Sequence, residues 1–222
     1  VPIVPYLLLM TLYGSIDRIL IERYFSIDDL GVYNFAFVIA GAVSVFISSC
    51  QNVINPMVYK LLAEDIVDEK RVNGLFKWFH YINTSIIALG LVVTVIFVDL
   101  FIAPQYQSIL NYIGALFLAY IFRIYYIMYS DSLFFYKKTR WISLITLVSF
   151  LVGLGSNLLL IPQFGILGVC ISVMIINLAQ AAGAYLQLVL YKLNRNFYQL
   201  NINHVYTIFV TAAYFISLAF LK

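Results

Sequence analysis

Seven long apolar stretches, separated only by short polar breaks, constrain this chain of 222 residues more than any other feature. A window of about 19 residues places them at about 1–24, 30–58, 75–102, 107–134, 141–161, 165–191 and 204–221. Each is long enough for a membrane helix, which needs about 20 apolar residues. None alternates apolar and polar residues as a membrane barrel strand would. The sequence therefore predicts an all-α membrane protein, a polytopic bundle of about seven transmembrane helices.

The composition agrees with this interpretation. Hydrophobic residues make up 64% of the chain and charged residues 10%, whereas soluble domains carry about 25% charged residues. A soluble domain is excluded, and nucleic-acid binding lacks the basic surface that it requires. The chain opens at Val1 directly in an apolar run, so we expect it to be a fragment of a longer protein.

Basic residues gather in alternate breaks between the apolar stretches. The breaks after the first, third and fifth stretches contain only Arg23. Those after the second, fourth and sixth contain nine basic residues: Lys60, Lys70, Arg71, Lys77, Lys137, Lys138, Arg140, Lys192 and Arg195. Because cytoplasmic loops are enriched in Lys and Arg, this asymmetry predicts that the nine residues face the cytoplasm.

Arg123 is the most informative polar residue, because it lies within the fourth apolar stretch. An arginine near the centre of a membrane helix costs about 2.5 to 3.5 kcal/mol, so its side chain should face protein or water. Tyr120 and Tyr126 follow helical spacing on the same face. This face either forms the wall of a cavity that binds an anionic head group, or Arg123 is a structural residue that caps backbone carbonyls of neighbouring helices.

Polar stripes run along other stretches at helical spacing. The second stretch carries Gln51 and Asn55, and the sixth carries Asn177 and Gln180. Such stripes either join packed helices or line a wet cavity, and their presence on several helices favours the cavity. With Arg123, Tyr120 and Tyr126, these four residues are the candidate substrate-binding set.

Three charged residues in or near apolar stretches are candidates for ion coupling or for a structural ion pair: Asp17, Arg18 and Asp131. Arg18 can pair with Glu22 one helical turn away, whereas Asp17 points about 100° from it and needs another partner. Asp131 lies eight residues after Arg123, about 12 Å along a helix, which is too far for a direct pair.

The sequence predicts no enzyme activity, no cofactor and no metal site. No cluster of His, Cys or carboxylate residues has metal-ligand spacing. The chain has no phosphate-binding glycine loop, nucleophile elbow or dinucleotide fingerprint.

Two segments resemble a known transporter family. The first is Asp17-Arg18-x-Ile-x-x-x-x-Phe, followed by the run from Leu30 to Phe37; the second runs from Leu160 to Val169 after the basic turn Tyr136-Lys137-Lys138-Thr139. Together they look like the second half of the Wzx-type polysaccharide-transport flippases, of the multidrug/oligosaccharidyl-lipid/polysaccharide (MOP) exporter superfamily. The resemblance covers nearly the whole chain, and its specificity depends on the combination of motifs.

The resemblance implies a two-bundle, MATE-like transporter. Residues 1–200 would form its second six-helix bundle, and residues 201–222 an additional C-terminal transmembrane helix. The implied function is to flip undecaprenyl-diphosphate-linked oligosaccharide repeat units across the bacterial cytoplasmic (inner) membrane for O-antigen or capsule synthesis. The implied partners are this lipid-linked substrate, the bilayer, the missing N-terminal bundle of the same protein and other polysaccharide assembly proteins, with no nucleic acid.

Two alternatives stay open. A cation-coupled multidrug exporter of the same superfamily would need carboxylates, rather than Arg123, deep in its cavity. A membrane-embedded glycan polymerase or ligase would need a large external loop with catalytic charges, and the external breaks are only a few residues long.

Overall fold

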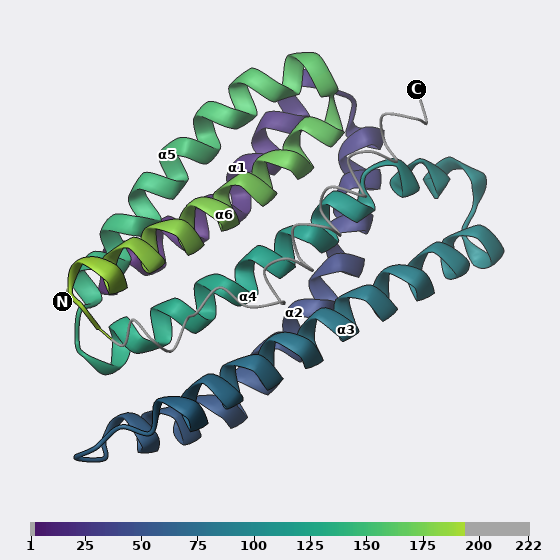
Figure 1. The fold of residues 1–222 in the computed structure, drawn as a ribbon. Coiled ribbons are helices and arrows are strands. Elements are labelled where there is room, and N and C mark those ends of the chain that lie inside the picture. Colours follow the sequence, from purple (N-terminus) through teal and green to yellow (C-terminus); the bar gives the residue numbers. More distant parts are fainter. Residues whose placement is uncertain (1–2, 194–222) are drawn as a thin grey trace.

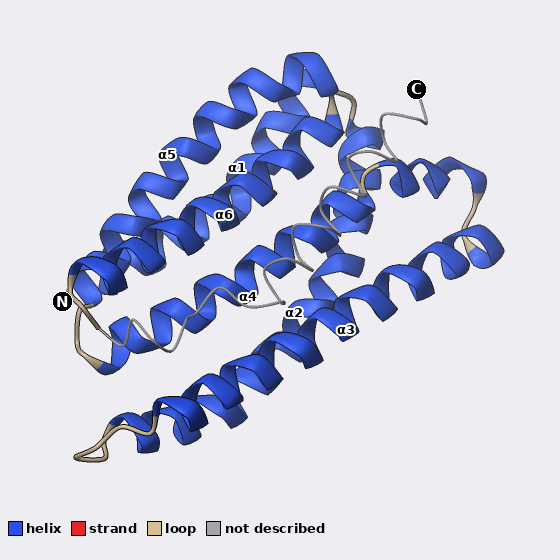
Figure 2. Ribbon diagram, in the orientation of Figure 1, coloured by secondary structure: helices blue, strands red, loops and turns tan. Residues whose placement is uncertain are grey.

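The computed structural model describes residues 3–193, and within this range the chain forms α-helices, one 3₁₀ helix and no strand (Figure 2). In chain order the elements are α1 (Ile3–Tyr24), α2 (Ile27–Leu62), α3 (Glu69–Phe101), η1 (Pro104–Asn111), α4 (Ile113–Phe135), α5 (Thr139–Phe164) and α6 (Ile166–Leu190). The predicted last stretch, 204–221, and the additional helix at 201–222 lie outside the described residues.

Five of these helices, α2 to α6, are long and apolar enough to cross a membrane. Each of the first six predicted stretches corresponds to one α-helix. The prediction of an all-α, multi-pass membrane protein is confirmed. The division into a bundle at 1–200 and a separate helix stays a prediction.

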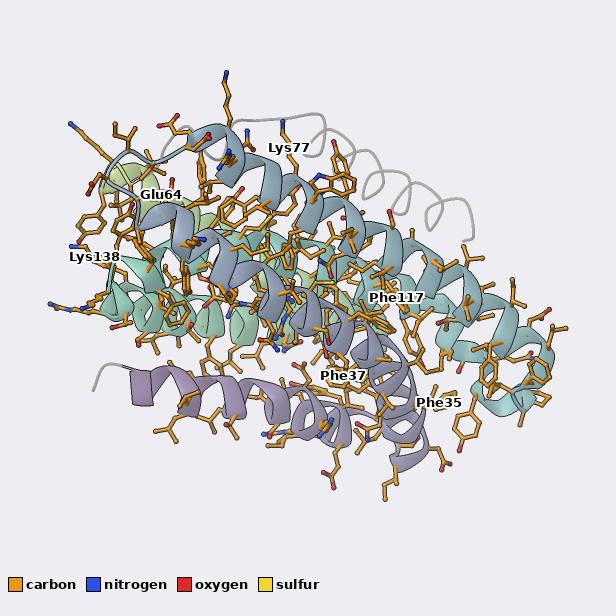
Figure 3. All side chains as sticks on the ribbon, turned by 90° about the horizontal axis from the view of Figure 1, so that it is seen from below. Phe35, Phe37, Glu64, Lys77, Phe117 and Lys138 are labelled. Atoms are coloured by element: carbon orange, nitrogen blue, oxygen red, sulfur yellow. The ribbon has the colours of Figure 1, made fainter. Side chains whose placement is uncertain are left out.

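The six α-helices run up and down, so that successive connections lie at opposite ends of the bundle (Figure 1). The loop between α2 and α3, the turn between α4 and α5 and the end of α6 share one end. Glu64, Lys77 and Lys138 lie toward this end in Figure 3, and Phe35 lies toward the other. The fold therefore gathers the basic breaks at one end, as the predicted orientation requires.

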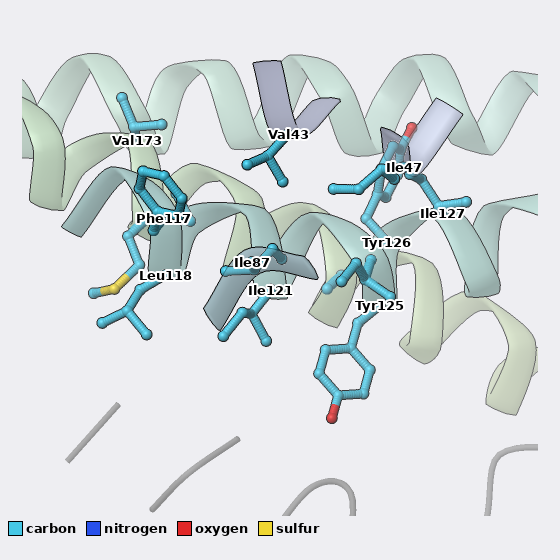
Figure 4. Close-up of a cluster of buried hydrophobic side chains, with 14 of the residues drawn as sticks. Val43, Ile47, Ile87, Phe117, Leu118, Ile121, Tyr125, Tyr126, Ile127 and Val173 are labelled. Carbon is cyan, nitrogen blue, oxygen red and sulfur yellow. The ribbon is translucent and has the colours of Figure 1, made fainter. Parts of the chain in front are cut away.

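The helices form two groups of three, with α1, α5 and α6 in one and α2, α3 and α4 in the other (Figure 1). α4 joins the groups, because it packs against α6 on one side and against α2 and α3 on the other. Figure 4 shows this core, where Phe117 and Ile121 of α4 meet Val43 of α2, Ile87 of α3 and Val173 of α6. α4 is therefore the central, most buried helix of the described bundle.

Two predicted stretches are shorter than the helices that contain them. α2 begins at Ile27 because Ser26 caps it, with its hydroxyl accepting from the amide of Asp29 while the Asp29 carboxylate accepts from the amide of Ser26. At α3 the carboxylate of Asp68 accepts from the amide of Arg71. Both helices thus extend beyond the apolar residues that a hydropathy window detects.

The predicted start of the fourth stretch, at about residue 107, is wrong. Residues Pro104–Asn111 form the 3₁₀ helix η1, and α4 begins only at Ile113. Proline suits the first turn of a helix, and the polar sequence that follows it gives no long apolar face to pack. Arg123 consequently lies ten residues into α4, about 15 Å from its first residue.

α5 and α6 meet almost without a loop. Gly165 joins them with φ of 62°, a left-handed conformation that suits glycine. Three residues later, a side chain at Gly168 would collide with the backbone carbonyl of Leu160. The close crossing of α5 and α6 therefore depends on glycine at both positions.

Candidate functional site

A cavity of about 50 Å³ lies between α2, α4 and α6. Three residues of the predicted binding set line it, namely Tyr120, Arg123 and Asn177. Its other lining residues are apolar: Phe37, Ala40, Leu116, Ala119 and Val173. The structure thus brings Tyr120 and Arg123 of α4 together with Asn177 of α6 in one pocket.

Helical spacing explains why these side chains converge. On α4, Leu116, Ala119 and Tyr120 precede Arg123 by seven, four and three residues, so all four share a face. On α6, Val173 and Asn177 are one turn apart. Small alanines at this face leave the room that longer side chains would fill.

The guanidinium of Arg123 has donors to offer to a ligand. In the part of the chain that the structure describes, no carboxylate lies within 4 Å of it. The nearest charged neighbour on α4, Asp131, contacts α2 instead. Tyr120 lies close enough to Arg123 to interact with its charge, and Ser44 of α2 lies near the Tyr120 hydroxyl. A half-buried guanidinium without a carboxylate partner among the described residues favours binding of an anion that carries several oxygens.

Asn177 adds a further polar group to the same pocket. Its amide nitrogen donates to the carbonyl oxygen of Val173, 2.9 Å away in the same helix. One N–H and the side-chain oxygen stay available to a ligand. The cavity therefore combines a cation, a phenol hydroxyl and an amide.

Asp131 forms a second polar cluster, between α4 and α2. Its Oδ1 atom accepts one hydrogen bond from Nε2 of Gln51 and one from Nδ2 of Asn55, both at 3.3 Å. Asp131 is only 3% exposed. The two amides lie one helical turn apart on α2, so the stripe predicted on this helix serves to hold a buried carboxylate.

Asp17 is the centre of a third cluster, which joins α1, α2 and α5. Its carboxylate accepts from Nδ2 of Asn157 at 3.1 Å and from the hydroxyl of Tyr33 at 3.4 Å. The expectation that Asp17 needs a partner other than its own helix neighbours is confirmed. Arg18 is exposed and lies over the ring of Phe37, with its guanidinium carbon 5.5 Å from the ring centroid.

The structure does not bring the whole predicted binding set together. Gln51 and Asn55 bind Asp131, while Tyr126 and Gln180 are buried and do not line the cavity. Sequence reasoning missed Phe37 and Ala40 as cavity residues, because apolar side chains give no signal of their own. Within residues 3–193, no group of His, Cys, Asp or Glu could hold a metal ion.

Two curated proteins of Haemophilus influenzae are similar to this chain. One, described as "Uncharacterized membrane protein", is 26% identical over 165 residues, which are 69% of this chain and 40% of that protein. The other, "Lsg locus putative protein 1", is 30% identical over 172 residues, 71% of this chain and 41% of that protein. No protein-family model and no solved structure matches. The chain spans about two fifths of the length of these relatives.

Proposed function

We propose that this chain is part of a transporter that flips an anionic lipid-linked glycan, an undecaprenyl-diphosphate-linked oligosaccharide, from the cytoplasmic to the external leaflet of a bacterial inner membrane. The observation that carries the proposal is the cavity lined by Arg123, Tyr120 and Asn177, in which the guanidinium has no carboxylate partner among the described residues. The similarity to bacterial membrane proteins supports the setting.

The physical problem in such transport is the charge of the diphosphate. A phosphate group without compensation is strongly disfavoured in the hydrocarbon region, as any charged group is. The planar guanidinium of Arg123 can donate two parallel hydrogen bonds to phosphate oxygens, and Tyr120 and Asn177 can donate to others. The cavity would supply these donors to the phosphates, whereas the glycan would need the space between this bundle and the remainder of the protein.

The charge of the cavity favours an anionic cargo over a cationic drug. A cavity for cations needs carboxylates, yet Asp131 and Asp17 are buried in separate clusters and already accept hydrogen bonds. We propose transport rather than catalysis for the same site, because no nucleophile or acid–base pair lines it.

The experiment is complementation of a strain that lacks the full-length gene and therefore displays no surface glycan. We expect Arg123→Ala to abolish glycan display, and Arg123→Lys to restore part of it, because lysine keeps the charge but loses the bidentate geometry. Arg71→Ala, which removes an exposed arginine from the first turn of α3, is the matched control and should display glycan normally. Membrane insertion of all three is measured by fractionation.

Full display with Arg123→Ala would refute the binding role and leave Arg123 a structural residue. Loss of display with both Arg123→Ala and Arg71→Ala would show that any lost arginine impairs the protein. Neither result is compatible with a specific anion site in the cavity.

A further inference from the structure

Four basic side chains gather at the end of the bundle where α4, α5 and α6 meet. Lys137 and Lys138 come from the turn between α4 and α5, Arg140 lies in the first turn of α5, and Lys192 follows α6. Three of them are exposed and Lys138 is half-buried. The segments that carry them, 136–141 and 191–193, contain no Asp or Glu. None of the four forms an ion pair within residues 3–193, so this basic end presents positive charge beside membrane-spanning helices.

Two aromatic rings lie among these charges. The ammonium nitrogen of Lys138 lies 4.8 Å from the centroid of the Tyr191 ring, and the rings of Tyr191 and Trp141 are 5.9 Å apart. Tyrosine and tryptophan favour the depth of the lipid head groups. The rings therefore place the basic end at the level of lipid phosphates.

Two lysines at the basic end adopt a backbone conformation that is strained for residues other than glycine. α4 and α6 both end in a Schellman motif: the amide of Lys138 donates to the carbonyl of Leu133, and that of Leu193 to the carbonyl of Leu188. The left-handed residue of this motif is usually glycine and sometimes asparagine. Here it is Lys137, with φ of 58°, and Lys192, with φ of 52°. Lysine occupies both strained positions, at the same end of the molecule.

The other basic loop at this end of the bundle provides a contrast. Lys70 and Arg71 lie within a few residues of four carboxylates in the sequence, at Glu64, Asp65, Asp68 and Glu69. Arg71 pairs with Asp68 at 3.3 Å. A general requirement for positive charge near the cytoplasm explains both loops, but it does not explain why only one of them lacks carboxylates and contains an aromatic pair.

We propose that the basic end, formed by Lys137, Lys138, Arg140 and Lys192 with Tyr191 and Trp141, binds the phosphate head group of an anionic phospholipid. Each basic side chain near an anionic membrane surface increases binding about fivefold. Bound lipid would fix the depth of α4 and α6, the two helices that supply Arg123 and Asn177 to the cavity. The inference depends on membrane insertion and not on the proposed cargo.

The test uses the full-length protein with the double variant Lys137→Asn/Lys192→Asn. Asparagine suits the left-handed backbone, so thermal stability in pure phosphatidylcholine bilayers should be unchanged or higher. The increase in melting temperature that phosphatidylglycerol gives the wild type should be lost. Phosphatidylglycerol retained on the protein, measured by native mass spectrometry, should fall by about an order of magnitude or more.

The matched control is Lys70→Asn/Arg71→Asn, which removes the same charge from the other loop and should keep the full effect of phosphatidylglycerol. If the basic-end variant keeps that effect, or if both variants lose it equally, the proposal is overturned. Retention of a diphosphate lipid but not of phosphatidylglycerol would also overturn it, since the site would then belong to a cargo. If the double variant does not fold, the exposed Arg140→Gln must lower retention about fivefold.

Discussion

The Asp131 cluster allows a stability prediction that tests how α2 and α4 are held together. We consider Gln51→Leu and Asp131→Leu, each alone and together, in the full-length protein. In the wild type the Gln51 amide donates to a carboxylate that is 3% exposed. Removing the amide alone leaves this buried carboxylate with the bond from Asn55. Removing both partners leaves an apolar contact, which is often close to neutral in stability.

The size of the coupling free energy between Gln51 and Asp131 follows from the length of their hydrogen bond and from its position between membrane helices. A hydrogen bond to a charged group contributes about 1.5 to 3 kcal/mol in soluble proteins. The distance of 3.3 Å is at the long end of the range, and side-chain bonds between membrane helices average about 0.6 kcal/mol, with a maximum of about 1.7. We expect a coupling free energy of about 1 kcal/mol between Gln51 and Asp131, so Gln51→Leu should cost that much less when Asp131 is already leucine.

The assay is reversible unfolding in bicelles, with the free energy of unfolding measured for all four members of the cycle. Asn52→Leu is the matched control, because it removes an exposed amide from the next position of α2 and should cost the same in both backgrounds. Double-mutant cycles resolve about 0.3 to 0.5 kcal/mol. A coupling below that limit would refute the inference that these bonds hold α2 to α4.

Three further predictions concern the other parts of the bundle. Gly168→Ala should lower the free energy of unfolding by about 1 to 3 kcal/mol, because the new Cβ atom would lie 2.6 Å from the carbonyl carbon of Leu160. The control is Gly155→Ala, whose Cβ atom would meet nothing within 4 Å and which should be neutral or stabilising. Asn157→Leu should cost about 1 to 3 kcal/mol in the same unfolding assay by leaving Asp17 with Tyr33 alone, and adding Asp17→Leu should recover part of that loss. Reporter fusions after Lys138 and after Gln105 should report cytoplasm and exterior respectively, and the opposite pattern would overturn the orientation.

The sequence predicts the helices well because a membrane span is a local property. Twenty apolar residues in succession leave few alternatives to a buried helix. The ends are harder, since hydropathy marks the part of a helix in lipid rather than the helix itself. Ser26 and Asp68 start α2 and α3 several residues before the apolar runs begin, and η1 takes the place of the expected first turns of α4.

Only the parts of the candidate site that lie on a single helix could be predicted from the sequence. Tyr120 and Arg123 share a face of α4 by spacing alone, and the structure places both in one cavity. The partners of Asp131 lie 80 and 76 residues away in the chain. Which face of α2 meets α4 depends on the rotation and packing of both helices, and no local pattern contains that information.

The lengths of α2 and α3 have a practical consequence for structural work on this protein. At 1.5 Å per residue, 36 and 33 residues span about 54 and 50 Å, whereas the hydrocarbon core is about 30 Å thick. Their shared end reaches beyond the neighbouring turn between α4 and α5 in Figure 1. Both helices are thus longer than the hydrocarbon core is thick, and the exposed loop that joins them, at Glu64 and Asp65, is a natural place to graft a rigid marker domain for electron microscopy.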